Sequence, residues 1–171
     1  MPMICRVDKL KNIDGSVVAV DFELTEAESA AESDMPPMTG PLFFHGQMEN
    51  RERVIKVTGQ LECVLRGLCD RCGTDVMTPL QCDFEESFTN LKDRADEEEA
   101  MIHFFEGDTI DLLPYVAQAI FLNMPMKTLC REDCKGLCSE CGINLNEKEC
   151  SCDKSPIDPR LAVLADLLNK G

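Results

Sequence analysis

Alternation of apolar and polar residues predicts the most distinct elements of the chain, which are β-strands. Residues 53–65 repeat with a period of two, as in a strand with one buried face. The side chains that share this face are Ile55, Val57, Leu61, Cys63 and Leu65. Further strands are predicted at 17–24, 41–48 and 75–88. Gly59 lies inside the 53–65 pattern and indicates a β-bulge there.

A helical period replaces the alternation after the strands. Apolar residues three and four positions apart predict a helix at 108–123. Asp108 or Asp111 can cap its N-terminus, Pro114 is tolerated in its first turn, and Pro125 ends it.

Polar segments and a second helix complete the predicted order. Residues 25–40 are acidic and predict a solvated loop or a ragged helix, and residues 92–99 predict a charged connector. The last helix is expected from Asp158, because Asp at the N-cap followed by Pro is a helix start. Its apolar stripe consists of Leu161, Leu164, Ala165 and Leu168.

Charge and hydropathy narrow the functional classes. The 171 residues carry 32 acidic and 17 basic side chains, a formal net charge of −15. Such a chain is poorly suited to binding the phosphate backbone of nucleic acids, because phosphate contacts need clustered Lys and Arg. No apolar run reaches the ~18 residues of a membrane span, and charged residues stand near the N-terminus where a signal peptide needs an apolar stretch. We therefore expect a cytoplasmic protein that is not bound to a membrane.

The eleven cysteines are the most informative feature. Cytosolic thiols stay reduced, so disulfides are not expected. Eight of the thiols form four close pairs, which are Cys69 and Cys72, Cys130 and Cys134, Cys138 and Cys141, and Cys150 and Cys152. Four thiolates satisfy the tetrahedral coordination of Zn²⁺, and Gly73 and Gly142 allow the chain to turn around an ion. These eight cysteines are the predicted ligands of two Zn²⁺ ions.

Two pairings of the cysteines remain open. Loop closure favours neighbours, so the four cysteines between 138 and 152 would form a local site. Cys69 and Cys72, at the tip of a predicted hairpin, would then join Cys130 and Cys134 after the helix. The rival pairing joins the two Cys-x-x-Cys-Gly segments, as in a zinc ribbon, and leaves the other four cysteines together.

The three remaining cysteines are not predicted ligands, and an iron–sulfur cluster is the alternative to zinc for the others. Cys5, Cys63 and Cys82 are interpreted as small apolar residues. The spacing from Cys134 through Cys138 to Cys141 matches the cluster ligands of radical S-adenosylmethionine enzymes, but those enzymes place the motif early in a large barrel. A thioredoxin-like redox site is disfavoured for Cys69 and Cys72, because strands are predicted on both sides of them.

Catalytic residues are not apparent. His45 and His103 are interpreted as structural or surface residues, and we find no glycine-rich phosphate loop and no nucleophile motif. A zinc ion with four thiolates has no open position for water. The chain is therefore not expected to be an enzyme.

Basic residues gather near the cysteine pairs, at Arg66, Arg71, Lys127, Arg131 and Lys135. They form either an RNA-contacting patch or a compensation for the −2 charge of each four-thiolate zinc site. We favour compensation, although zinc knuckles do occur in RNA-binding modules.

Together these patterns predict an α+β fold. It has a twisted antiparallel sheet of four or five strands with a packed helix at 1–123, and a zinc-stapled, cysteine-rich C-terminal appendage with a terminal helix at 124–171.

Several segments resemble one known family. The carriers are Cys69-Asp-Arg-Cys72 after a strand, Ile110-Asp-Leu-Leu before a helix, the block 124–146 and Asp158-Pro-Arg-Leu near the end. They resemble the YceD family, the large ribosomal RNA subunit accumulation proteins, in the form with a full C-terminal cysteine cluster found in Gram-positive-type bacteria. The resemblance implies a part in accumulation or processing of large-subunit ribosomal RNA, with no established enzymatic activity. It also implies that Cys69, Cys72, Cys130 and Cys134 correspond to the family's metal-capable residues.

Three functions are therefore considered. The favoured one is a non-enzymatic zinc-binding protein that supports ribosome assembly, by binding a basic ribosomal protein or a large-subunit precursor ribonucleoprotein. The alternatives are an RNA-binding zinc-knuckle module and a metal or redox sensor.

Overall fold

The computed structural model describes residues 3–32, 34–95 and 101–152. The chain divides into two compact units. The sheet unit comprises Met1–Gly67 and Asp75–Thr128, and the cysteine unit comprises Leu68–Thr74 and Leu129–Gly171. The predicted division into domains at 1–123 and 124–171 was drawn along the chain and stays a prediction. In the structure, the turn Leu68–Thr74, which is distant in sequence, belongs to the same unit as the C-terminal cysteine-rich segment.

A curled five-stranded sheet is the frame of the sheet unit, and it confirms the predicted α+β class. Its strands follow the order β2-β3-β4-β5-β6. Their bounds are Val17–Leu24 for β2, Leu42–Arg51 for β3, Val54–Leu68 for β4, Asp75–Thr89 for β5 and Ile102–Phe104 for β6. The first four coincide closely with the predicted strands, because each alternates apolar and polar side chains.

Smaller elements surround this sheet. Strands β1 (Ile4–Arg6) and β7 (Thr109–Asp111) form a separate antiparallel pair. A 3-10 turn at Leu10–Asn12 and helix α2 at Lys92–Ala95 are also present. The acidic segment contains helix α1 (Glu26–Ala31), whose start is fixed by a reciprocal capping box between Thr25 and Glu28.

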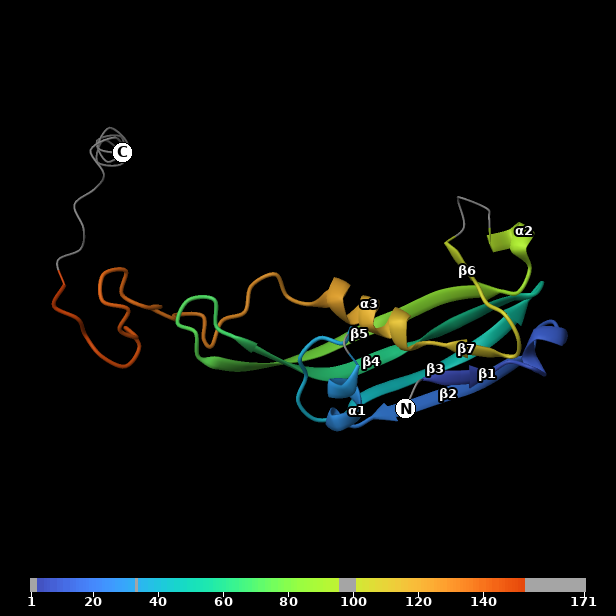
Figure 1. Ribbon diagram of the computed structural model, residues 1–171, viewed down its shortest axis with the longest axis horizontal. Helices are drawn as coiled ribbons and strands as arrows, with labels where there is room; N and C mark the ends of the chain where they lie inside the picture. The colour runs from blue at the N-terminus through green and yellow to red at the C-terminus, as the bar shows by residue number, and fades with distance from the viewer. Residues whose placement is uncertain (1–2, 33, 96–100, 153–171) are drawn as a thin grey trace, which may run out of the picture. The chain divides into compact units, whose positions relative to one another are not determined.

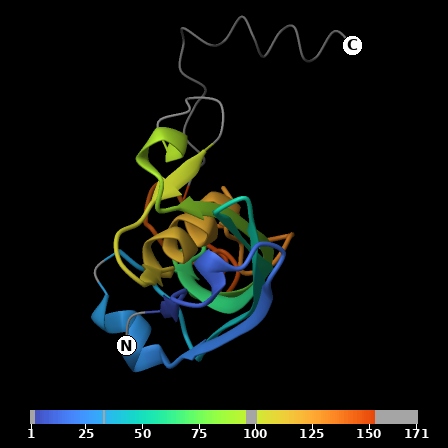
Figure 2. The same cartoon turned by 90° about the vertical axis from the view of Figure 1, so that its right-hand side faces the viewer.

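Helix α3 (Leu113–Asn123) packs on the sheet and closes the core. It lies over β4 and β5 (Figure 1), and in the end-on view the strands curve around it (Figure 2). The helix buries Leu113, Val116, Ala117 and Ile120. The core that it completes is mainly aliphatic, with Phe44, Phe84 and Phe88 as its buried aromatic side chains on the sheet.

The start of α3 differs from the prediction of 108–123. The helix begins at Leu113 because residues 109–111 are extended and pair with β1. Asp111 still supports the start, since its Oδ1 accepts a hydrogen bond from the backbone N–H of Leu113 at 3.0 Å. Pro114 lies in the first turn, as predicted.

Gly59 does not form the predicted β-bulge. It pairs in regular register with Gly46 of β3. A Cβ on Gly59 would lie 2.6 Å from the carbonyl oxygen of His45 and 2.8 Å from the ring of Phe44. The glycine is therefore required by a close approach of backbone and aromatic ring, which is the other reason for glycine inside a strand.

One strand pairing is parallel, whereas the predicted sheet was antiparallel throughout. Strand β6 runs parallel to β5, with Ser87 opposite Ile102 and Thr89 opposite Phe104. About a dozen residues separate the two strands, which is the length a parallel connection needs. The predicted charged connector at 92–99 supplies most of this length.

Two further predictions concern the C-terminal helix and membrane-spanning helices. The terminal helix expected from Asp158 lies outside the described residues. Within the described part of the chain, every helix is too short or too polar to cross a bilayer.

Candidate metal centres

The two Cys-x-x-Cys-Gly segments fold into the same local turn. In the first, the N–H of Gly73 donates to the carbonyl of Cys69 at 2.8 Å; in the second, the N–H of Gly142 donates to the carbonyl of Cys138 at 2.9 Å. Both glycines have a positive φ, 72° and 71°, a conformation that favours glycine. The turns predicted at these two glycines are thereby confirmed, and we call them knuckles.

Four thiols from distant segments meet at the first knuckle. This inner cluster consists of Cys69, Cys72, Cys130 and Cys134, whose sulfur atoms all lie within 4.8 Å of one another. The Sγ atoms of Cys69 and Cys134 are 3.8 Å apart, and those of Cys72 and Cys130 are 3.6 Å apart. Three of these thiols are buried, and Cys130 is exposed.

Arg71 ties the two halves of the inner cluster together. Its Nη1 donates to the carbonyl oxygen of Cys134 at 2.8 Å, and its own carbonyl accepts from the N–H of Leu137 at 3.1 Å. Close to it, a Cβ on Gly136 would lie 3.0 Å from the Arg71 carbonyl oxygen. The knuckle at 69–73 and the segment 130–137 therefore fit each other closely.

The inner thiols are arranged to support negative charge. Burial opposes ionisation of Cys69, but backbone hydrogen bonds from Cys130, Arg71 and Cys72 outweigh it and lower the pKa of this thiol to about 6. Cys130 is exposed as a residue, but desolvation of its sulfur among the other thiols, together with hydrogen bonds to them, raises its pKa to about 12. Four thiols this close cannot all ionise alone, because like charges repel; a cation would allow it.

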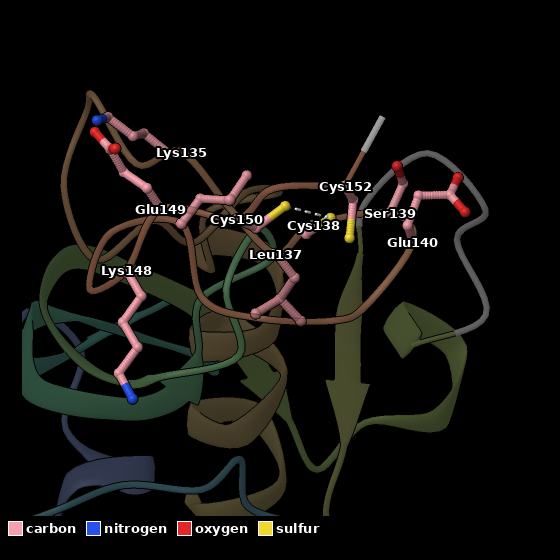
Figure 3. Close-up of a pocket in the computed structure, with 10 residues that line it drawn as sticks. Lys135, Leu137, Cys138, Ser139, Glu140, Lys148, Glu149, Cys150 and Cys152 are labelled. Atoms are coloured by element: carbon pink, nitrogen blue, oxygen red, sulfur yellow. Dashed lines mark hydrogen bonds between the residues drawn. The ribbon is translucent and has the colours of Figure 1, made fainter. Parts of the chain in front are cut away.

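The remaining four paired cysteines form an outer cluster at the second knuckle. It consists of Cys138, Cys141, Cys150 and Cys152, again with all sulfur atoms within 4.8 Å. Figure 3 shows the sulfur atoms of Cys138, Cys150 and Cys152 gathered together, with Cys138 and Cys150 joined at 3.3 Å. Cys138 and Cys150 are half-buried, and Cys141 and Cys152 are exposed. The outer cluster is thus more accessible than the inner one.

The outer knuckle repeats the electrostatics of the inner one. Backbone hydrogen bonds from Cys141 and Glu140 lower the pKa of Cys138 to about 6. Hydrogen bonds to Cys141 and Cys150 raise the pKa of Cys152 to about 12. Around the thiols, a shallow pocket is rimmed by Lys135, Lys148 and Glu149, and the side chain of Lys148 points away from the sulfur atoms (Figure 3).

The geometry of both clusters could hold single metal ions. Four sulfur atoms at about 2.3 Å from a tetrahedral ion are about 3.8 Å from one another, close to the sulfur separations of the inner cluster. The eight thiols gather in the pairing that loop closure favours, and the zinc-ribbon pairing is not formed. Cys134 belongs to one cluster, and Cys138 and Cys141 to the other, so the three cysteines of the iron–sulfur spacing do not act together. That the eight paired cysteines act as metal ligands stays a prediction.

The other singled-out residues have ordinary structural positions. Cys5, Cys63 and Cys82 lie in the apolar core, as predicted. The imidazole of His45 pairs with Asp21, and that of His103 pairs with Glu86, each at 2.9 Å.

Four of the five basic residues near the thiols make contacts within their own unit, and among the described residues the Lys127 side chain makes none. In the cysteine unit, Arg71 donates to backbone carbonyls and Arg131 donates to Asn146 at 2.7 Å. Lys135 is fixed through its backbone N–H, which donates to the same Asn146 oxygen at 2.8 Å. In the sheet unit, Arg66 lies 3.8 Å from Asp75. These contacts favour a structural use of Arg71 and Arg131.

Two supporting residues were not anticipated. The Nδ2 of Asn146 donates to the sulfur of Cys134 at 3.3 Å, and the hydroxyl of Thr74 lies 3.1 Å from the sulfur of Cys72. An amide or hydroxyl next to a cysteine pair is the signal that could have revealed them, since metal ligands are commonly held by such groups.

Comparison with known proteins gives a consistent picture. Residues 57–168 match the model of the family described as Large ribosomal RNA subunit accumulation protein YceD. An uncharacterized protein of Mycobacterium tuberculosis is 33% identical over 124 residues, covering 71% of this chain and 59% of that protein. The uncharacterized protein YlbN of Bacillus subtilis is 34% identical over 103 residues, covering 60% of this chain and 59% of the relative.

A plant relative carries a descriptive name. Large ribosomal RNA subunit accumulation protein YCED homolog 1, chloroplastic, from Arabidopsis thaliana is 24% identical over 162 residues, covering 78% of this chain and 50% of the relative. The chain thus spans between half and about three fifths of the length of these three relatives. No solved structure matches the chain.

Proposed function

The chain belongs to the YceD family, and from this membership and its two thiol clusters we propose that it is a non-enzymatic zinc-binding protein that supports accumulation of large-subunit ribosomal RNA. The observation that carries the proposal is the presence, in a chain of this family, of two closed sets of four thiols. Such closed sets are typical of structural metal sites.

Zinc is the metal we propose for both clusters. Its ligands would be Cys69, Cys72, Cys130 and Cys134 in the inner cluster, and Cys138, Cys141, Cys150 and Cys152 in the outer one. Four thiolates leave no coordination position for water, so each ion would hold the fold together without hydrolysing a substrate. Because the four sulfur atoms of each cluster all lie within 4.8 Å of one another, they favour a single ion over a multi-iron cluster.

The partner we propose is a basic ribosomal protein, or a large-subunit precursor ribonucleoprotein that contains one, met in the cytoplasm. The sheet unit carries 23 acidic and 10 basic side chains, whereas the cysteine unit carries 9 and 7. The negative charge is therefore concentrated on the sheet unit, where it would attract a basic protein and repel bare RNA.

Metal stoichiometry tests the first half of the proposal. Mass spectrometry under native conditions should find two zinc ions per chain. The Cys150→Ser/Cys152→Ser variant should retain one ion, which the inner cluster holds. The Cys69→Ser/Cys72→Ser variant should lose the inner-cluster ion. A wild-type chain that folds fully without metal would contradict the proposal.

Affinity capture at low salt tests the second half. The tagged full chain should retain large-subunit precursor particles or a basic ribosomal protein, and the yield should fall as salt is raised, since charge attraction is screened. Deletion of the gene should lower the amount of large-subunit ribosomal RNA. Absence of the chain from all precursor fractions, together with normal ribosomal RNA after deletion, would contradict the proposal.

An RNA-binding zinc knuckle is the second candidate. Lys135 and Lys148 at the rim of the outer cluster favour it (Figure 3). However, the described part of the cysteine unit has no aromatic side chain on which a base could stack. Under this alternative, Lys135→Ala/Lys148→Ala would abolish RNA retention; under the proposal above, it would leave capture of the ribosomal partner unchanged.

A further inference from the structure

The side chain of Asn146 links the two thiol clusters. In sequence, Asn146 lies between Cys141 and Cys150, inside the loop that the outer cluster closes. In space, its Nδ2 donates to the sulfur of Cys134, an inner-cluster thiol, at 3.3 Å. One side chain therefore belongs to the loop of one cluster and contacts a thiol of the other.

Asn146 is held in this orientation from several directions. Its Oδ1 accepts from the backbone N–H of Lys135 at 2.8 Å and from Nη2 of Arg131 at 2.7 Å. Its Nδ2 and its backbone N–H both donate to Oδ1 of Asn144, at 2.8 and 3.0 Å. The side-chain oxygen, the side-chain nitrogen and the backbone N–H of Asn146 each have a defined partner, so the surrounding fold fixes the N–H···S contact.

The loop itself is anchored at both ends of the outer cluster. The N–H of Leu145 donates to the carbonyl of Gly136 at 2.9 Å, and Leu137 forms a β-bridge with Asn144. At the other side, Cys141 and Cys150 place their sulfur atoms in the outer cluster. The outer cluster therefore closes the two ends of the loop that carries Asn146, while backbone contacts with residues 136 and 137 hold its middle.

We propose that Asn146 is a positioning residue that couples the two metal centres, so that metal in the outer cluster slows the loss of metal from the inner cluster. The inference rests on the metal binding proposed above. When the outer cluster is filled, its loop is closed and the Asn146 amide supports the Cys134 thiolate. When the outer cluster is empty, the loop is released and Cys134 loses this hydrogen bond.

The expected size of the coupling follows from known effects of such supporting groups. Removing a hydrogen-bond partner of a metal ligand typically lowers metal affinity by about 10–100-fold. Coupling between sites is also reciprocal in equilibrium binding, so metal in the inner cluster would favour binding in the outer one to the same extent. The more accessible outer cluster would then act as the gate for metal exchange of the whole cysteine unit.

Cadmium exchange on the full chain tests this coupling. The chain is loaded with ¹¹³Cd²⁺, and an excess of NMR-silent ¹¹⁴Cd²⁺ is added, so that both clusters stay filled while the label leaves. The Cys150→Ser/Cys152→Ser variant identifies the inner-cluster resonance and gives its exchange rate when the outer cluster cannot close. We expect the inner-cluster rate to rise on the order of 10-fold in this variant.

Asn146→Ala in an otherwise native chain should raise the inner-cluster rate by a similar factor. Combined with Cys150→Ser/Cys152→Ser, it should add almost nothing, because both changes remove the same contact. Asn146→Asp keeps the size of the side chain but lacks the N–H, and it should exchange at least as fast as Asn146→Ala. Asn123→Ala, at the end of α3 in the sheet unit, is the matched control and should leave the rate unchanged.

The outcomes separate the two proposals. A wild-type chain without two thiolate-bound cadmium resonances would overturn metal binding itself. Two normal resonances with an inner-cluster rate that is unaffected by Asn146→Ala, or with effects that multiply in the combined variant, would overturn the coupling alone.

Discussion

The sheet unit and the cysteine unit are stabilised by different means. The sheet unit encloses an apolar core drawn from its strands and from α3. In the described part of the cysteine unit, the only buried residues are Cys69, Cys72, Cys134 and Gly136. The sheet unit buries apolar side chains, whereas the cysteine unit brings thiol groups together.

From this difference we expect the cysteine unit, unlike the sheet unit, to need the bound cations proposed above. Small units without an apolar core usually need a disulfide or a structural metal. The thiols of the cysteine unit are free, and in each cluster the sulfur atoms lie close enough to share one ion. Four experiments test whether the two units are stabilised independently and by these different means.

Removal of metal by a strong chelator should unfold the cysteine unit and leave the sheet unit folded. Structural zinc contributes about 10–16 kcal/mol in zinc-finger peptides, far more than the few apolar contacts available here. Two-dimensional amide NMR of the full chain would show loss of dispersion for the residues of the cysteine unit only, and added Zn²⁺ should restore it. Dispersed signals from both units after complete removal would erase the distinction.

Phe44→Ala should destabilise the sheet unit by about 3–5 kcal/mol, the usual cost of emptying an aromatic core position. Phe44 is fully buried and makes an edge-to-face contact with Phe84, with ring centroids 5.3 Å apart. Urea unfolding measures the change, and Phe121→Ala, at a 52% exposed position, is the control expected to stay within about 0.5 kcal/mol. Zinc content should not change, and its loss would show that the two units depend on each other.

Two glycines of the same strand should respond in opposite ways to alanine. Gly59→Ala would place a Cβ 2.6 Å from the carbonyl oxygen of His45, and overpacking of this kind costs about 1–3 kcal/mol. Gly67, also in β4, has open space at the same position, so Gly67→Ala should gain about 0.5–1 kcal/mol. Urea midpoints compare them directly, and equal effects would argue against the close approach of β3 and β4.

Thiol reactivity should differ between the buried cysteines of the sheet unit and the clustered cysteines of the cysteine unit, and measuring it requires no change in stability. Burial and the nearby Asp111 carboxylate raise the pKa of Cys5 to about 11, and burial and nearby Cys82 raise that of Cys63 to about 11. A raised thiol pKa favours the neutral form, so these two thiols should resist alkylation until the pH rises from 9 towards 11.

Metal removal is expected to unfold the cysteine unit and return its eight paired thiols to an ordinary pKa near 9. At pH 9 these thiols should therefore react about 50-fold faster than Cys5 and Cys63, because about half of an ordinary thiol is ionised there and only about one hundredth of a thiol with a pKa of about 11. Residue-by-residue mass spectrometry after timed iodoacetamide treatment measures this ratio. Modification of Cys5 or Cys63 at the rate of exposed Cys130 would show that the apolar core is open.

Features that depend on neighbouring residues were predicted correctly. Strands β2 to β5 follow from alternation along each segment, and the family resemblance, carried mainly by residues 124–146, is confirmed by the family match. The knuckles at Gly73 and Gly142 likewise follow from four or five consecutive residues. The start of α3 was wrong, because residues 109–111 pair with a strand more than a hundred positions earlier.

By itself, the sequence determined the strands, the helix that covers them, and the four cysteine pairs, since each is encoded by spacing within a short segment. Only the tertiary structure decided which thiols share a cluster, that β6 runs parallel to β5, that Gly59 serves a close approach, and that Asn146 contacts Cys134. These four features depend on contacts between segments brought together by folding, and local periodicity carries no information about such contacts.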